Sequence, residues 1–448
     1  MKQTVFSKFF CAALAAALLA ACAAQPQSAS QAESAGQSAP EGALRPLAAD
    51  PAMIGDMTLA DGALYLPQYV FVQNGSDEAP IYDSWYLLLR MDLETMTIAP
   101  ACAVEGCRHD GHDCPAYHQN WSPAGLIEDG VRTSTQTVWA GAPILRVERQ
   151  TLDGTGLRET LSSRMGQAWM GVYLDSASYT DGEAVYCLAS LPMQQGETSP
   201  SWQWVRIALA DGDITAVPLT VDEGAYLTSE SCVTDAGEAV VRSELYNVDG
   251  QGGMQIVYYA LRADGTMREL WRPPAGSLAV GAGKDALFAA ETGTGALTAF
   301  DLHSEQALAL ENTAAGAGET STSCTARQIG EFAVVCRGVA DEAGAWREEA
   351  FAVPLGGGER TDLTLTRTAA EMVQGSANAP LEVVCETPQG LVVLTEYRTL
   401  DSGATRSIYA LIREEDYFAN RGEYRAFTYW DEADWVEADK TQEGGSDI

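Results

Sequence analysis

The sequence has few basic residues. It contains 27 Lys and Arg against 62 Asp and Glu in 448 residues, which gives a net charge of −35. Binding to nucleic acid needs a basic stripe, so this balance excludes nucleic acid as a partner. Anionic lipid or wall polymer would also be repelled, except through a covalent anchor, whereas cationic partners or divalent cations would be attracted. The acidity also has a plain physical role, because a highly charged surface keeps an exported protein soluble.

Histidine is scarce, and common catalytic motifs are missing. The chain has four histidines, His303 and three within residues 109–118. A Ser-His-Asp site would have to use one of these. The G-x-S-x-G and H-E-x-x-H patterns and the spacing of a Ca²⁺-binding loop are absent. Carboxylates are numerous enough for an acid/base pair of a hydrolase or lyase, but no pair stands out. We therefore predict no catalytic residue.

Long apolar runs are also absent beyond the first residues. The run Phe9–Ala21 follows Lys2 and Lys8 and is shorter than the roughly 20 residues that span a bilayer. A basic start, a short apolar stretch and small residues predict an export signal over residues 1–21. The end of the run, Leu19-Ala20-Ala21-Cys22, resembles the lipobox of bacterial lipoproteins. That resemblance implies that Cys22 carries a diacylglycerol and becomes the first residue of the mature protein, although a signal peptide without a lipid is the alternative.

The composition divides the rest of the chain into three parts. Residues 22–50 are rich in Ala, Gln, Ser, Gly and Pro with few large apolar side chains, which predicts a lipidated, flexible tether. Residues 51–425 contain enough apolar sequence for a sizeable core and are predicted to be the folded domain. Residues 426–448 are predicted to be a solvated acidic tail. The lipid would hold this domain on the extracytoplasmic face of the cell membrane.

The folded domain repeats one β pattern and shows no long helical periodicity. A turn with Gly precedes a short apolar strand, and a hairpin with a polar turn such as Asp211-Gly212 or Asp264-Gly265 follows. Such turns recur at intervals of 46 to 68 residues, at Gly62, Gly130, Gly182, Gly237, Gly283, Gly330 and Gly390. Units of this size with about four strands each are typical of a β-propeller. We therefore predict an all-β fold, a β-propeller with seven blades; a pair of β-sandwich domains is the alternative.

One short segment combines cysteine and histidine. Residues 102–114 contain Cys102, Cys107, His109, His112 and Cys114 in the spacing C-x4-C-x-H-x4-C, with His112 as a spare. Three thiolates and one imidazole can complete a tetrahedral Zn²⁺ shell, which makes zinc a possible cofactor. Outside the cytoplasm thiols can oxidise, so a disulfide with one cysteine left over is the competing interpretation of this segment. A redox role is a third. A Cys324–Cys336 bridge is also open at this point.

Several features together resemble a known family. The lipobox, the polar tether, the blade-like repeats and the cysteine-rich loop after the first blade are similar to uncharacterised β-propeller (TolB-like) lipoproteins of Gram-positive anaerobes. The shared segments are Pro100-Ala101-Cys102, Cys107-Arg108-His109 and Cys114-Pro115-Ala116-Tyr117. The resemblance implies a fold and a location, and no particular activity. We predict a membrane-anchored module that binds a peptide, glycan or protein partner, with a cell-surface hydrolase or lyase and a metal or redox role of the loop as alternatives.

Overall fold

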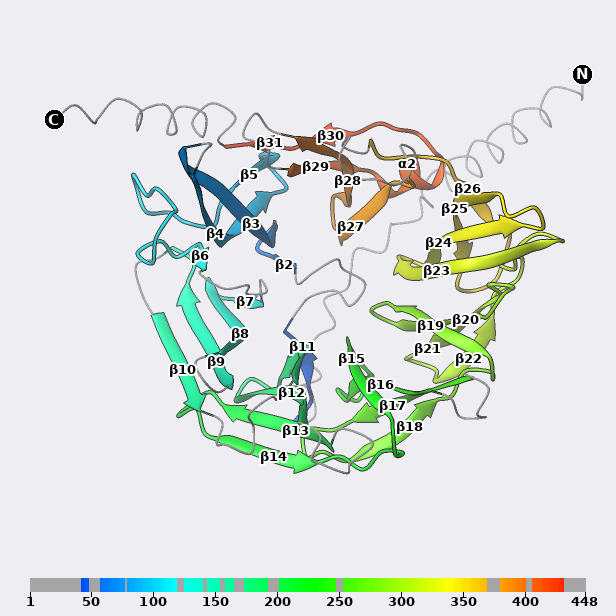
Figure 1. Cartoon of the computed structure of the whole chain (residues 1–448), viewed down its shortest axis with the longest axis horizontal. Helices are drawn as coiled ribbons and strands as arrows, with labels where there is room; N and C mark the ends of the chain where they lie inside the picture. Colours follow the sequence, from blue (N-terminus) through cyan, green and yellow to red (C-terminus); the bar gives the residue numbers. More distant parts are fainter. Residues whose placement is uncertain are drawn as a thin grey trace, which may run out of the picture. The chain divides into compact units, whose positions relative to one another are not determined.

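Seven mainly antiparallel sheets are arranged in a ring, and each is built around four consecutive strands of the chain (Figure 1). The computed structural model describes residues 42–47, 57–76, 79–118, 125–139, 143–153, 158–164, 173–191, 201–246, 253–368, 379–399 and 405–430. In each sheet the first of these four strands lies on the inner side of the ring, and the other three lie progressively farther out (Figure 1). The predicted all-β, seven-bladed propeller is confirmed.

The first three blades contain the following strands. Blade 1 contains β2 (Thr58–Ala60), β3 (Ala63–Ser76), β4 (Ala79–Asp92) and β5 (Thr97–Pro100), with β6 (Tyr117–His118) paired to β4. Blade 2 contains β7 (Leu126–Glu128), β8 (Val131–Trp139), β9 (Pro143–Thr151) and β10 (Arg158–Arg164). Blade 3 contains β11 (Tyr173–Thr180), β12 (Ala184–Leu191), β13 (Ser201–Ala208) and β14 (Ile214–Pro218).

The other four blades continue the pattern around the ring. Blade 4 contains β15 (Tyr226–Val233), β16 (Ala239–Tyr246), β17 (Met254–Leu261) and β18 (Met267–Trp271). Blade 5 contains β19 (Ser277–Ala282), β20 (Ala286–Glu291), β21 (Leu297–Asp301) and β22 (Gln306–Ala309). Blade 6 contains β23 (Glu319–Ile329), β24 (Phe332–Asp341), β25 (Trp346–Pro354) and β26 (Thr361–Leu363). Blade 7 contains β27 (Glu382–Thr387), β28 (Gly390–Thr399), β29 (Thr405–Ile412) and β30 (Arg425–Ala426), with helix α2 (Glu414–Phe418) between β29 and β30.

The seven predicted glycine turns lie between the first and second strands of the blades. Gly62, for example, connects β2 to β3, and Gly237 connects β15 to β16. The turns therefore mark the second strand of each blade, one strand later than the start that the sequence pattern indicates. Second strands such as β12 and β20 are buried almost throughout, because neighbouring blades cover both of their faces. This double burial explains their nearly continuous apolar sequence.

The hydrophobic core consists of separate layers between the blades. One cluster joins blades 3 and 4 and contains Trp202 and Trp204, both 1% exposed. Trp204 stacks on Tyr186 with ring centroids 5.8 Å apart. These tryptophans are thus packing residues and are not exposed platforms for a sugar. Similar clusters join blades 2 and 3, 4 and 5, 5 and 6, and 6 and 7, while the largest joins blade 1 to blade 7.

Two short strands lie outside the predicted limits of the domain, 51 and 425. Strand β1 (Arg45–Pro46) pairs with β11, the innermost strand of blade 3, and Leu44 and Leu47 beside it are buried. Strand β31 (Thr428–Tyr429) pairs in parallel with β5 of blade 1. Both ends of the propeller are therefore held by backbone pairing that begins within the predicted tether and the predicted tail. Cys22 and residues 431–448 lie outside the described residues.

Candidate metal centre

The cysteine-rich segment forms a loop between β5 and β6 at blade 1. Both ends of the loop are attached to the same residue, because Ala101 N donates to Leu88 O and Leu88 N donates to Ala116 O, each at 2.8 Å. Gly106 with φ of 70° and His109 with φ of 59° turn the backbone between these points. Left-handed backbone of this kind reverses the chain within a few residues. The loop is therefore closed and brings its donors to one side.

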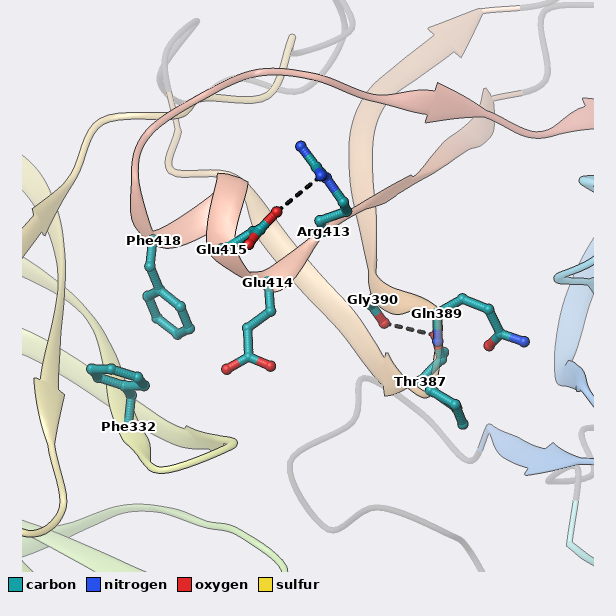
Figure 2. Close-up of a pocket in the computed structure, with 9 residues that line it drawn as sticks. Phe332, Thr387, Gln389, Gly390, Arg413, Glu414, Glu415 and Phe418 are labelled. Carbon is teal, nitrogen blue, oxygen red and sulfur yellow. Dashed lines mark hydrogen bonds and ion pairs between the residues drawn. The ribbon is translucent and has the colours of Figure 1, made fainter. Parts of the chain in front are cut away.

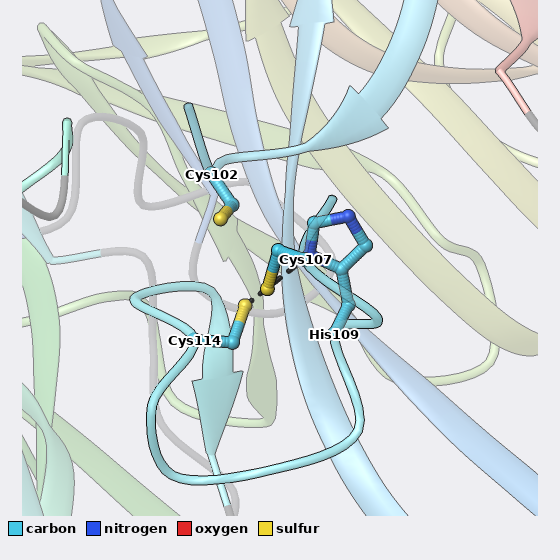
Figure 3. A group of neighbouring side chains, drawn as sticks. All are labelled: Cys102, Cys107, His109 and Cys114. Atoms are coloured by element: carbon cyan, nitrogen blue, oxygen red, sulfur yellow. Dashed lines mark hydrogen bonds between the residues drawn. The ribbon is translucent and has the colours of Figure 1, made fainter. Parts of the chain in front are cut away.

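Four side chains of the loop converge (Figure 3). The Sγ atoms of Cys102, Cys107 and Cys114 and a ring nitrogen of His109 all lie within 4.8 Å of one another. His109 Nδ1 is 3.3 Å from Cys114 Sγ. Cys114 is buried, and the other three are half-buried. No disulfide joins the three cysteines of the loop.

The donor set fits zinc. A tetrahedral Cys3His shell is a common structural zinc site, with Zn–S bonds of about 2.3 Å and Zn–N bonds of about 2.0 Å. Four donor atoms at such distances from one ion lie less than 4.8 Å apart, as these do. Soft thiolates also favour Zn²⁺ over Mg²⁺ or Ca²⁺. With all four positions filled by protein, such a site would be structural, since a catalytic zinc keeps one position open.

Burial favours the uncharged forms of Cys102, His109 and Cys114. Desolvation raises the pKa of the Cys102 and Cys114 thiols above their ordinary value of 9.0. Desolvation also lowers the pKa of His109 below 6.5. Bound zinc removes protons from coordinating thiols, so such a site releases protons as it fills.

The loop contacts the C-terminal strand of its own sheet on one side and blade 2 on the other. On one side the His109 ring meets the Trp430 ring edge-on, with centroids 5.4 Å apart. Trp430 directly follows β31, and its N donates to Ile98 O in β5 at 3.0 Å. On the other side Gln150 Nε2 of blade 2 donates to Pro115 O at 2.6 Å. The loop thus lies between the C-terminal strand and blade 2.

The structure brings together some of the predicted site residues and leaves one of them outside the cluster. It brings Cys102, Cys107, His109 and Cys114 together, while His112 points elsewhere and packs edge-on against Tyr117 with ring centroids 5.1 Å apart. Cys22 lies outside the described residues. The contact with Trp430 is one that the sequence analysis missed, because no local signal connects positions 109 and 430.

The other cysteine pair is separated by the strand register. Cys324 lies opposite Arg337, and Cys336 lies opposite Thr325. Neighbouring positions of a strand point to opposite faces of the sheet. Accordingly Cys324 packs in the layer between blades 5 and 6, and Cys336 in the layer between blades 6 and 7. A bridge between them would have to cross the sheet.

Comparison with known proteins found similar solved structures, each at low sequence identity. No family model and no curated protein sequence matches it. The β-propeller domain of the Trilobed protease from Pyrococcus furiosus is similar over 85% of this chain and 99% of that one, with 8% identity and a TM-score of 0.45. The β-1,2-mannobiose phosphorylase from Listeria innocua is similar over 85% of this chain and 93% of that one, with 11% identity and a TM-score of 0.27. An endo-arabinase from Bacteroides thetaiotaomicron is similar over 64% of this chain and 92% of that one, with 11% identity and a TM-score of 0.26.

Fold and site together define a class of protein. The chain is a seven-bladed β-propeller with a Cys3His cluster in the loop that follows its first blade. Within the part of the chain that the structure describes, no helix has the length and apolar character needed to cross a membrane.

Proposed function

We propose that this protein is a lipid-anchored, extracytoplasmic binding propeller whose Cys3His cluster holds a structural Zn²⁺ ion. The convergence of Cys102, Cys107, His109 and Cys114 within 4.8 Å is the observation that carries the zinc site. The anchor at Cys22, the location and the likeness to TolB-like lipoproteins follow from the N-terminal sequence and the loop motifs. They remain part of the proposal.

Zinc would stabilise the closure of the ring. The loop lies between β31, which joins the C-terminus to blade 1, and blade 2. A bound ion would fix the position of His109, and the edge-on contact would then support Trp430 and the strand before it. A metal adds order to a short loop because it fixes several of its side chains around one ion. The role that we propose for the ion is therefore structural.

A disulfide is the competing state of this loop. Outside the cytoplasm any two of the three cysteines can oxidise, which would leave one thiol. The geometry favours zinc because all three sulfurs and a ring nitrogen of the imidazole lie within 4.8 Å of one another. A disulfide alone gives no reason for that fourfold convergence.

Metal analysis combined with thiol counting separates the two states. The chain from residue 23, purified anaerobically without chelator, is expected to contain about one zinc per chain, the stoichiometry of a single Cys3His site. The Cys114→Ser variant should lose the zinc. The matched control His112→Ala, which changes the histidine outside the cluster, should retain it. Absence of metal together with only one reactive thiol in the loop would overturn the zinc site in favour of a disulfide.

The anchor has its own test. Full-length protein made in a bacterial host is expected in the membrane fraction, and the Cys22→Ala variant should move to the soluble extracytoplasmic fraction. Two acyl chains give stable membrane residence, whereas an unlipidated form would keep no comparable attachment. Equal membrane association of both forms would contradict lipidation at Cys22.

A further inference from the structure

A cavity lies where blades 6 and 7 meet, far from the cysteine cluster in sequence. Its volume is about 520 Å³. Three segments line it: Phe332 at the start of β24, the turn Thr387–Gly390 between β27 and β28, and Arg413, Glu414, Glu415 and Phe418 around helix α2 (Figure 2). Cavities of roughly 300–1,000 Å³ are the usual size for small organic ligands.

Two phenylalanine rings form one wall of the cavity. Phe332 and Phe418 are both half-buried, and their ring centroids are 4.4 Å apart. Figure 2 shows the two rings next to each other, with Glu414 on the same side of the cavity. Aromatic faces attract ammonium and guanidinium groups and also cover apolar carbon.

The carboxylate of Glu414 extends into this cavity without a partner among the described residues (Figure 2). A Cβ placed on Gly330 would be 3.0 Å from Glu414 Oε1, so the carboxylate lies directly against the turn before β24. Burial, together with the nearby charges of Glu386 and Glu331, raises the pKa of Glu414 above 4.5. Negative charge is therefore concentrated around this turn.

The one basic side chain of the cavity wall is already neutralised. Arg413 Nε is 2.6 Å from Asp416 Oδ2, and Arg413 Nη1 is 2.9 Å from Glu415 Oε1. Figure 2 shows the Arg413–Glu415 pair on the side of α2 away from Glu414. Glu414 is thus left to attract a cation from outside.

A metal ion does not fit this arrangement. Among the described residues, only the cysteine cluster brings three or more metal-ligating side chains within 4.8 Å of one another. The carboxylates of Glu331, Glu386 and Glu414 do not converge in that way. One unpaired carboxylate beside two rings instead matches a cation that carries apolar carbon.

We propose that this cavity binds an organic cation, an ammonium or guanidinium group on an apolar chain, with Glu414 contacting the charge and Phe332 and Phe418 covering the carbon. The proposal rests on the binding role proposed above and names the chemical class of its ligand. The same chemistry occurs in free polyamine-like compounds and in the basic side chains of peptides.

Calorimetric titration of the chain from residue 23 at low salt tests the proposal. Agmatine represents the free amine, N-acetyl-arginine amide represents the peptide side chain, and N-acetyl-citrulline amide is the uncharged counterpart. At least one of the two cations should bind at a single site, and the citrulline compound should bind at least tenfold more weakly. Whichever cation binds more tightly identifies the source of the ligand.

Variants locate the site. Glu414→Gln should weaken binding by about tenfold to a hundredfold, the range for loss of a charged hydrogen-bond partner. Phe418→Leu should weaken it by about two- to fivefold through loss of the aromatic face. The control Glu311→Gln removes the same charge from an exposed position in blade 5 and should leave affinity unchanged. Unchanged melting temperatures show that the variants are folded.

The outcomes are distinct from those of the zinc test. Absence of binding by both cations, equal affinity for the citrulline compound, or equal loss in Glu414→Gln and Glu311→Gln would overturn the cavity proposal. Zinc content measured on the same samples reports on the cysteine cluster alone. A protein that binds the cation without zinc would refute the metal centre and leave the cavity proposal intact.

Discussion

At the scale of single residues, local spacing named the residues of the Cys3His cluster as a candidate site for a metal or a disulfide. The four donors of the cluster lie within 13 residues of chain, so C-x4-C-x-H-x4-C was sufficient to name them. The pattern treated His112 as a spare, and in the structure His109 lies in the cluster while His112 packs against Tyr117. What spacing could not supply was the contact with Trp430, because that residue comes from the far end of the chain.

Glu238 is a charged residue whose importance only the structure reveals. It is 3% exposed and lies between two arginines, 2.8 Å from Arg262 Nε and 2.8 Å from Arg268 Nη2. Arg268 also pairs with Glu305 of blade 5 at 2.6 Å. Burial alone would raise the pKa of Glu238, but the two guanidinium groups outweigh it and hold the pKa below 4.5.

We expect Glu238→Gln to lower the free energy of unfolding by about 1–3 kcal/mol at pH 7, because it removes a buried charged partner. The folded-state pKa lies below the ordinary value, so the ionised form stabilises the fold above pH 4.5. The difference between variant and parent should persist at neutral pH and shrink as the pH falls below that value. Urea unfolding at several pH values measures it.

The control for this prediction is an exposed glutamate of the same blade. Glu269 pairs with Arg272 at 2.7 Å, but both side chains are largely in solvent. Glu269→Gln should change the free energy of unfolding by less than about 0.5 kcal/mol. A comparable effect of the two substitutions would show that the burial of Glu238 is unimportant.

At the scale of strands and turns, the glycine spacing predicted the number of blades but placed their beginnings one strand late. Inner strands such as β2 and β7 have three residues each and no apolar run. The second strands are longer and buried on both faces, so they dominate the sequence pattern. These short strands form because they pair with the second strand of their own blade. Sequence periodicity does not report such a contact.

Gly281 shows how closely the inner strands approach each other. A Cβ at this position of β19 would overlap the backbone oxygen of Ala326 in β23, on the next blade. Gly281→Ala is therefore expected to destabilise the protein by about 2–3 kcal/mol, the cost of forcing extra volume into a packed interface. Gly356→Ala, where nothing lies within 4 Å, should stay within about 0.5 kcal/mol of the parent. Thermal unfolding of both variants makes the comparison, and equal stabilities would contradict the close approach.

At the scale of the whole molecule, both ends of the described chain take part in the ring. Strand β31 pairs with β5, so the last strand joins blade 1 after the chain has passed through blade 7. Near the other end, Leu44 N donates to Gly237 O at 2.7 Å, in the turn between the first two strands of blade 4. The cavity beside Glu414 is lined by the equivalent turn of blade 7. Leu44 and the proposed ligand site therefore lie at the same end of the propeller.

Removal of residues 42–47 should destabilise the propeller. Leu44 and Leu47 are 3% and 4% exposed, and burial of a leucine contributes about 1.5–3 kcal/mol. A chain that begins at residue 48 is expected to unfold with a free energy about 3 kcal/mol or more below that of a chain that begins at residue 42. Urea unfolding of the two forms measures the difference. Identical midpoints would show that the pairing of β1 with β11 adds no stability.

The sequence by itself determined the class of fold, the number of blades and the acidic character, and it named the residues of the Cys3His cluster as a candidate site. These features depend on residues that are close together in the chain or repeat along it. The tertiary structure decided the closure of the ring through β31, the docking of β1 and the cavity lined by Phe332, the turn Thr387–Gly390 and residues around helix α2. Their parts are tens to hundreds of residues apart, and only the packing of blades around a common centre brings them together.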